Sequence, residues 1–157
     1  MEIKAYCNKN NKVMNIFFES EINNIPPEKI KKNELKECKN LEKLLKKYIN
    51  GKEVNFKKYY DLNLLNITEF EKKVYKETLK IPRGKVKTYK EIGENINSKG
   101  YRAIGNALNK NTIPIIIPCH RVIGSNKKLT GFRGGLTMKK KLLEKEGLKI
   151  KNEKVII

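Results

Sequence analysis

Two short apolar runs open the chain. Residues 3–6 and 13–18 each have the length and composition of a strand, and the Asn-Lys-Asn-Asn segment at 8–11 between them is typical of a turn. The three segments together predict a β-hairpin at the start of the chain.

A helical pattern follows a double-proline break. Apolar residues recur at three- and four-residue steps over 28–50, and Gly51 suits the position just past the last helical turn. Residues 52–67 show no clear period, so we interpret them as the connection between two halves. The expected organisation is an N-terminal α/β domain over 1–67 and a second domain over 68–157.

Two Thr-x-x-Glu capping boxes begin helices in the second half. The first predicts a helix from about 69 to Leu79, and the second, which starts at Thr88, predicts a short helix to about Ile96. A four-residue turn then leads to a helix over 101–109. Two short helices joined by a tight turn resemble a helix-turn-helix, although any two-helix corner of a small domain would look the same.

The remaining segments are an apolar run, a glycine-rich loop and a last helix. The apolar run at 115–117 is typical of a buried strand. Residues 124–135 contain several glycines, which allow close backbone approach to a ligand but are weak evidence for one. Residues 136–146 fit a helix that ends at Gly147.

The charge balance favours a polyanionic partner. The chain contains 36 Lys and Arg against 17 Asp and Glu, for a formal net charge of +19. A field of this size favours nucleic acid, although a lysine-rich surface produced by AT-rich coding would give the same numbers. No apolar run of about 18 residues is present, so no membrane span is expected. Without a secretory signal or a disulfide framework, the chain is expected to be cytoplasmic.

The residues with the most informative chemistry stand at 118–122, Pro-Cys-His-Arg-Val, where the only histidine follows a cysteine. A thiol must lose its proton before it attacks, and an imidazole is a common base for that step. Adjacent side chains of an extended chain point to opposite sides, so a sharp turn or a bridging water is needed for His120 to act on Cys119. The alternative is an inert, buried Cys119.

A carboxylate that orients the imidazole would complete such a site. Glu146 is the candidate, because a negative charge in the last turn of a helix needs a compensating partner; an ordinary surface glutamate is the alternative. Cys7 and Cys38 either pair as a disulfide or belong to the core, and with no spare histidine beside them no metal site is expected. The small residues Ala103 and Gly105 allow close approach by DNA, or simply tight helix packing.

Taken together, these residues resemble the O6-alkylguanine-DNA alkyltransferase family. The resemblance runs almost without gaps from about Phe70 to Gly147 and includes the Pro-Cys-His-Arg-Val motif, the Arg-Ala-Ile-Gly helix, the Gly-Phe-Arg-Gly-Gly loop and the closing Leu-Leu-x-x-Glu-Gly. It implies an α/β (α+β) fold. In that fold an RNase H-like sheet-and-helix domain precedes a mostly helical domain that holds a helix-turn-helix and the active-site loop.

The resemblance also implies the reaction and its partners. Cys119 would accept an alkyl group from O6 of guanine, and from O4 of thymine, in an irreversible single turnover without any cofactor or metal. The partner would be double-stranded DNA containing O6-alkylguanine, bound by a monomer through the minor groove with the base flipped out.

Particular positions receive roles from the same resemblance. His120 would deprotonate Cys119 through a water, Glu146 would hold His120, and Asn111 would brace the turn. The DNA-binding set would be Tyr89, which also assists the leaving group, with Thr88, Arg102, Ala103, Gly105 and Asn106. The substrate pocket would be formed by Val122, Arg133, Phe132, Pro114 and Gly134.

Two departures and three alternatives accompany this interpretation. Phe132 stands where the family often has tyrosine, and Tyr101 and Asn106 are bulkier than the usual residues of the groove-facing helix. The main alternative is a non-catalytic protein that recognises alkylated DNA, in which the cysteine is usually replaced; here Cys119 is present. A cysteine hydrolase would leave the DNA-binding helix without a purpose, and a regulatory DNA-binding protein would leave the Cys-His-Glu set without a role.

Overall fold

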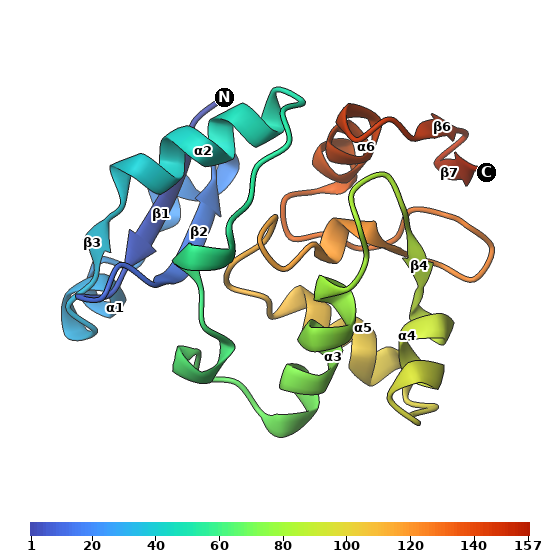
Figure 1. Cartoon of the computed structure of the whole chain (residues 1–157), viewed down its shortest axis with the longest axis horizontal. Helices are drawn as coiled ribbons and strands as arrows, with labels where there is room; N and C mark the ends of the chain where they lie inside the picture. Colours follow the sequence, from blue (N-terminus) through green and yellow to red (C-terminus); the bar gives the residue numbers. More distant parts are fainter. The chain divides into compact units, whose positions relative to one another are not determined.

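The computed structural model describes all 157 residues. The chain has mixed α/β structure, as the sequence predicts, and divides into two compact units, Met1–Asn66 and Ile67–Ile157 (Figure 1). None of the helices combines the length and the apolar character that crossing a membrane requires.

The first unit is built on a three-stranded sheet. Strands β1 (Ile3–Cys7) and β2 (Val13–Phe18) are antiparallel, which confirms the predicted hairpin. Strand β3 (Lys36–Glu37) pairs with the other edge of β1, so the order is β2-β1-β3. Asn8 closes the hairpin turn because its Oδ1 accepts from the backbone N–H groups of Asn10 and Lys12. The sheet buries Ile3, Ala5, Cys7, Val13, Ile16 and Phe18.

The predicted single helix over 28–50 is wrong. The chain forms α1 (Pro27–Lys32), then β3, then α2 (Lys39–Ile49). The helix stops because Glu34 adopts a positive φ of 53°, which redirects the chain so that β3 can pair with β1. Helix α2 packs against β1 and buries an apolar face of Leu41, Leu45, Tyr48 and Ile49 (Figure 1). The short 3-10 helices of this unit are η1 (Glu19–Asn24), η2 (Lys57–Tyr59) and η3 (Leu62–Leu64).

The helices of the second unit agree with the sequence prediction. They are α3 (Glu69–Leu79), α4 (Tyr89–Asn95), α5 (Tyr101–Asn109) and α6 (Leu136–Lys145). Both capping boxes are formed: the Thr68 hydroxyl accepts from Glu71 N at 3.1 Å and the Thr88 hydroxyl accepts from Glu91 N at 3.0 Å. These local bonds satisfy N–H groups that a helix N-terminus leaves without partners.

Helices α4 and α5 pack closely around a tight turn. A Cβ added at Gly93 of α4 would lie 2.6 Å from the carbonyl oxygen of Ser98 and 2.8 Å from the ring of Tyr101. Only glycine fits this place, so the backbone of the turn lies directly on α4. This corner has the arrangement of the expected helix-turn-helix.

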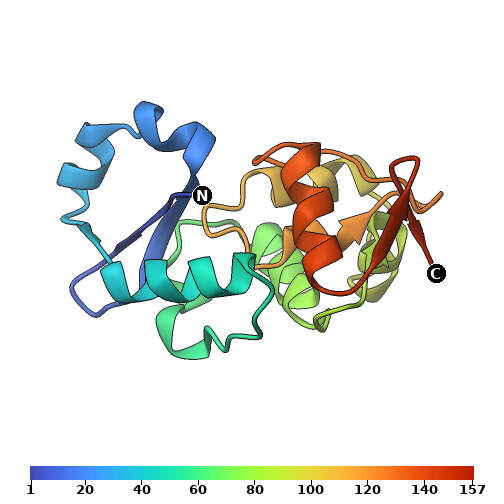
Figure 2. The ribbon, with the colours of Figure 1, turned by 90° about the horizontal axis from the view of Figure 1, so that it is seen from above.

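Two features of the second unit differ from the sequence prediction. Residues 115–117 form a turn rather than a strand, because Ile115 has a φ of 74° and Pro114 and Ile117 form an isolated bridge. The strand that forms in this part of the chain is β5 (Val122–Ile123), which pairs in parallel with β4 (Lys87–Thr88). A C-terminal hairpin of β6 (Lys149–Lys151) and β7 (Lys154–Ile156) was not predicted (Figure 2).

A small apolar cluster explains that hairpin. Val155 of β7 is buried with Ile123, Leu129 and Leu143. The hairpin turn uses two residues with positive φ, Asn152 and Glu153, which follow no strong turn signature in the sequence. Burial of Val155 against this cluster, rather than a local turn signal, therefore stabilises the hairpin.

Candidate active site

A tight turn presents Cys119. The residues after Pro118 form the 3-10 helix η4 (Cys119–Arg121), and Cys119 is buried with 8% of its surface exposed. The buried side chain of Asn111 ties the turn together: its Nδ2 donates to the carbonyl of Ile117 at 2.9 Å and to Sγ of Cys119 at 3.3 Å. Its Oδ1 accepts from Ile113 N at 3.0 Å. Asn111 thus connects the backbone before the turn to Ile117 and to the Cys119 thiol.

The environment of Cys119 keeps its thiol protonated at rest. Burial raises the pKa of the Cys119 thiol, while the hydrogen bond from Asn111 and the positive charges of Lys139 and Arg133 partly oppose that rise. A group of this kind needs a base to become a nucleophile. The same donors and charges stabilise the thiolate once it forms.

His120 and Glu146 form a buried pair. His120 is fully buried, and its Nε2 lies 3.1 Å from Oε2 of Glu146. The Arg121 guanidinium clamps the same carboxylate, with Nε at 3.0 Å from Oε1 and a terminal nitrogen at 2.7 Å from Oε2. Arg121 also donates to the carbonyl of Ile81 at 2.7 Å. Sequence reasoning assigned no role to Arg121, although it stands inside the Pro-Cys-His-Arg-Val motif.

The His120 imidazole is neutral and the Glu146 carboxylate is ionised. Burial acts to raise the pKa of Glu146, but the hydrogen bonds from His120 and Arg121 outweigh it and bring the pKa to about 2. Burial lowers the pKa of His120, and Glu146 opposes that shift only in part. An ionised carboxylate can only accept, so Nε2 of His120 carries the hydrogen and Nδ1 is the basic nitrogen. His120 can therefore take up a proton.

Lys139 is a second residue that the sequence reasoning missed. It is fully buried, and its Nζ donates to the carbonyls of Val122 at 2.6 Å and Thr130 at 2.7 Å. Burial lowers its pKa to about 8, against the opposing influence of Cys119. The available signal was its spacing, because Lys139 shares the apolar face of α6 with Leu142 and Leu143.

The glycine-rich loop contributes contacts to the same cluster. The Arg133 guanidinium donates to the carbonyl of Asn111 at 2.8 Å. The Phe132 ring meets the His120 ring edge-on, with centroids 6.4 Å apart. Thr130 donates to the hydroxyl of Tyr89 at 3.1 Å, and burial raises the pKa of that hydroxyl. Tyr89 also lines a pocket of about 280 Å³ with Lys90, Tyr101 and Ser125.

Helix α5 has one buried and one exposed face. Ile104, Ala107 and Leu108 face the core, whereas Arg102, Ala103 and Asn106 are exposed. Gly105 is half-buried, and a Cβ added there would meet only the Tyr89 ring, at 3.9 Å. Gly105 is therefore not required by packing within the protein.

The structure thus joins some expected site residues and separates others. Cys119, His120, Glu146 and Asn111 share one buried cluster, and Val122 enters it through Lys139. Thr88 caps α4. Pro114 belongs to the turn before Cys119, and Gly134 is half-buried in the loop before α6. No group of three or more His, Cys, Asp and Glu side chains has an arrangement that could hold a metal ion.

The sequence of this chain is similar to methyltransferases of one family. A family model described as "6-O-methylguanine DNA methyltransferase, DNA binding domain" matches residues 69–148. The chain is 49% identical over 104 residues to the methylated-DNA–protein-cysteine methyltransferase of Methanosarcina mazei, which covers 65% of this chain and 63% of the relative. A relative of the same name from Sulfolobus acidocaldarius is 48% identical over 103 residues, covering 66% and 63%. These matches span less than two thirds of the curated relatives' length.

Solved structures extend the similarity beyond the matched segment. The crystal structure of Mycobacterium tuberculosis OGT in complex with DNA superposes with a TM-score of 0.69 and 29% identity, covering 91% of this chain and 85% of that one. The O6-methylguanine-DNA methyltransferase from Pyrococcus kodakaraensis also gives a TM-score of 0.69 at 29% identity, covering 92% and 90%.

Proposed function

Because the chain belongs to the 6-O-methylguanine DNA methyltransferase family, we propose that it repairs DNA by moving an alkyl group from O6 of guanine to Cys119. O4 of thymine is the second proposed substrate position. The observation that carries the proposal is the buried Cys119 thiol, to which the side chain of Asn111 donates a hydrogen bond. The residue after Cys119 is a neutral histidine, His120, which is hydrogen-bonded to the ionised Glu146. We further propose that residues 1–67 and 68–157 act as separate domains, with the reaction in the second.

Binding begins with the charge of the protein and the shape of α5. The net charge of +19 attracts the DNA backbone. The face of α5 that carries Ala103, Gly105 and Asn106 enters the minor groove, and Arg102 takes the place of the flipped base in the stack. Thr88 and Tyr89, at the start of α4, contact the backbone beside the lesion. Flipping costs a few kcal/mol, which Arg102 and the pocket contacts offset.

The transfer itself is a displacement at the alkyl carbon. The proton of Cys119 passes through a water to Nδ1 of His120, and Glu146 stabilises the imidazolium that results. The thiolate attacks the alkyl carbon, the bond from that carbon to O6 breaks, and its electron pair goes to the guanine. Tyr89 supplies a proton to N3 of the leaving base. Proton exchange with solvent then returns the imidazolium of His120 to its neutral form, restores the proton of Tyr89 and moves the proton of the base from N3 to N1. The products are a thioether on Cys119 and an unmodified guanine.

The remaining pocket residues hold the base in place. The carbonyl of Val122 accepts from the guanine amino group, since a carbonyl oxygen that already accepts from Lys139 retains a second lone pair. The backbone N–H of Arg133 donates to O6, and Phe132, Pro114 and Gly134 shape the walls. The substrate carries its own leaving group, so the proposed reaction uses no cofactor, and the stable thioether limits each molecule to one turnover.

Partner and location follow from the same proposal. The partner is double-stranded DNA that contains O6-alkylguanine, and a monomer suffices because Cys119, His120 and Glu146 come from one chain. We place the protein in the cytoplasm, where free thiols persist; all three of its cysteines are free.

The test is the mass of the intact protein after incubation with a duplex containing O6-methylguanine. We expect a gain of one methyl group in at most one equivalent, mapped to Cys119 and absent in Cys119→Ala and with unmodified duplex. Tight binding to the lesion without a mass gain would instead indicate the non-catalytic recognition protein. No gain and no preference for the lesion would contradict both functions.

The Gly105→Ala substitution separates DNA binding from folding. Alanine in mid-helix is expected to raise the free energy of unfolding by up to about 1 kcal/mol, since the new Cβ meets only Tyr89 at ordinary contact distance. The same Cβ projects toward the groove, so the affinity for a lesion duplex is expected to fall about fivefold or more, or ~1 kcal/mol. Denaturant unfolding and fluorescence anisotropy give the two values. The control is Thr137→Ala on the exposed face of α6, and unchanged affinity in Gly105→Ala would remove α5 from the proposed interface.

A further inference from the structure

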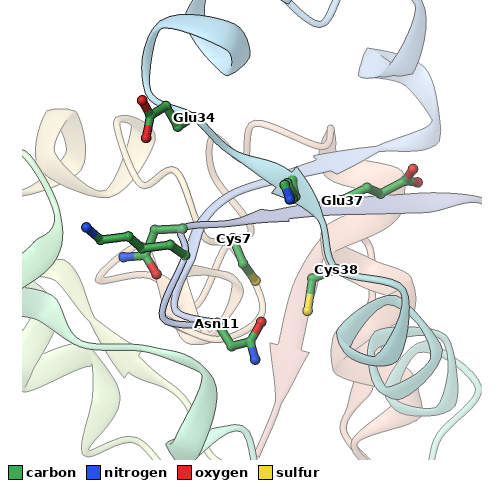
Figure 3. A pocket seen from close by; sticks show the side chains of 8 residues that line it. Cys7, Asn11, Glu34, Glu37 and Cys38 are labelled. Atoms are coloured by element: carbon green, nitrogen blue, oxygen red, sulfur yellow. The ribbon is translucent and has the colours of Figure 1, made fainter.

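Two cysteines of the first unit lie on the same face of its sheet. The β1–β3 ladder pairs Tyr6 with Glu37 and Cys7 with Lys36, and Cys38 N continues it by donating to the carbonyl of Ala5 at 2.8 Å. Side chains alternate along a strand, so Cys38 lies on the face of Ala5 and Cys7, one diagonal step from Cys7. Figure 3 shows the Cys7 and Cys38 side chains next to each other, with both sulfur atoms on the same side of the strands.

The two thiols interact and differ in exposure. Burial raises the pKa of the Cys7 thiol, and a hydrogen bond with the Cys38 side chain raises it further. Cys7 is 3% exposed, whereas Cys38 is half-buried. A reagent in solvent therefore reaches Cys38 first and the more deeply buried Cys7 second.

A polar pocket leads to this pair. Cys7 and Cys38 both line a hollow of about 580 Å³, which is also lined by Asn8, Lys9, Asn11, Glu34, Lys36 and Glu37 (Figure 3). The volume suits a peptide-sized thiol compound. The positive field of the whole chain favours an anionic one.

The segment that carries Cys38 is short. Strand β3 contains two residues, and Cys38 is the residue before the first turn of α2, with φ of −100° and ψ of 87°. Diagonal neighbours in a sheet stand roughly 7–8 Å apart, slightly beyond the Cα separation of about 4.4–6.8 Å that a disulfide spans, so the backbone must move for the bond to close. Cys38 is tied to β1 by its own N–H, which donates to the carbonyl of Ala5, and to α2 by its carbonyl, which accepts from Glu42 N. We therefore expect the shift that closes the bond to involve β3 and the first turn of α2.

From this geometry we propose that Cys7 and Cys38 are a reversible oxidation site, at which a low-molecular-weight disulfide of the glutathione type converts the two thiols into a disulfide. The Cys38 thiolate attacks one sulfur of the small disulfide, whose S–S bond breaks and releases one thiolate that takes up the Cys38 proton. Cys7, as its thiolate, then attacks Sγ of Cys38, the mixed S–S bond breaks, and the departing small thiolate takes up the Cys7 proton to become the second free thiol. Cys7 and Cys38 lose two electrons in total, and the small disulfide becomes two thiols.

The disulfide would encircle residues 8–37, which include the hairpin turn, β2 and α1. A cross-link over a loop of this length restricts the unfolded chain more than the folded one. We expect the oxidised protein to melt higher, by about 5 °C or more. This site is separate from alkyl transfer, since Cys119 takes no part in it.

The test incubates the full-length protein in glutathione buffers of increasing disulfide content and maps peptides without reduction. We expect a loss of two hydrogens and a Cys7–Cys38 cross-linked peptide, reversed by dithiothreitol, with Cys119 still able to accept a methyl group. A glutathione adduct that persists on Cys38, or two thiols that stay free in the most oxidising buffer, would overturn the proposal.

Matched variants identify the order of attack. Cys7→Ser is expected to trap glutathione on Cys38, whereas Cys38→Ser is expected to slow any adduct on Cys7 at least tenfold. Equal rates of adduct formation in the two variants would contradict the assigned order. Phenylarsine oxide checks the spacing in the unmutated protein: one arsenic bridging both thiols supports the pair, and failure to bridge them contradicts it.

Discussion

Replacing Glu146 by glutamine is expected to slow alkyl transfer to Cys119 about 100-fold or more, which is the usual contribution of a well-placed general base. The amide retains the size of the carboxylate but loses the negative charge that stabilises the His120 imidazolium and holds the Arg121 guanidinium. Single-turnover transfer from an O6-methylguanine duplex measures the rate.

The dependence on pH distinguishes a base from a structural support. If His120 and Glu146 deprotonate the thiol, the ratio of the wild-type transfer rate to the Glu146→Gln rate falls as pH rises. At high pH, hydroxide ionises Cys119 without their help. A ratio that stays constant with pH would show that Glu146 only supports the fold. Glu144→Gln is the control, since Glu144 is exposed on the same helix.

Glu146 also makes stability depend on pH in a defined direction. Its pKa is about 2 in the folded protein, against 4.5 as the ordinary value. The carboxylate therefore stabilises the fold fully above about pH 4.5, and this contribution is lost as pH falls toward 2. The difference in unfolding free energy between the wild type and Glu146→Gln should shrink through that window in urea titrations. A difference that is independent of pH would contradict the assigned ionisation.

Replacing Lys139 by methionine is expected to slow transfer about tenfold or more and to move the pH–rate profile to higher pH. The buried ammonium is one of the charges that lower the pKa of Cys119, so its removal leaves the thiol harder to ionise. The substitution also leaves the carbonyls of Val122 and Thr130 without their shared donor. Transfer rates measured from neutral to alkaline pH provide the profile.

The difference in unfolding free energy between the wild type and Lys139→Met is expected to depend on pH. The pKa of Lys139 is lowered from 10.5 to about 8, so the folded protein favours the neutral amine. The stability that comes from the neutral Lys139 amine is therefore present above about pH 10.5 and is lost as pH falls through 8. As pH is raised from 8 to 10.5, the unfolding free energy of the wild type should rise relative to that of Lys139→Met. Lys140→Met, at an exposed neighbouring position, should show neither effect. An unshifted rate profile in Lys139→Met would contradict the electrostatic role.

Much of the second unit was predictable because its signals are local. A capping box involves residues three apart, so Thr68 and Thr88 define where α3 and α4 begin without reference to the rest of the chain. The Pro-Cys-His-Arg-Val motif likewise places Cys119 and His120 in one short segment. Glu146 was found because a negative charge at the end of α6 requires a partner.

The errors occurred where distant parts of the chain decide the structure. The helical pattern over 28–50 is interrupted because β3 pairs with β1, some thirty residues earlier in the sequence. The apolar run at 115–117 forms a turn in which Ile117 N donates to the carbonyl of Ile113 and the side chain of Asn111 donates to the carbonyl of Ile117, so no strand partner is needed there. An apolar run reports burial, and it does not report which backbone conformation is buried.

The sequence by itself determined the family, the adjacent Cys119 and His120 that we propose as nucleophile and base, and the helices of the second unit. Each of these depends on residues that are close together along the chain. Only the tertiary structure decided the clamp of Arg121 on Glu146, the buried position of Lys139 and the neighbouring thiols of Cys7 and Cys38. Those contacts join residues 25, 17 and 31 positions apart, and their energies depend on burial. Burial is a property of the folded chain, so charge and residue type could not reveal it in advance.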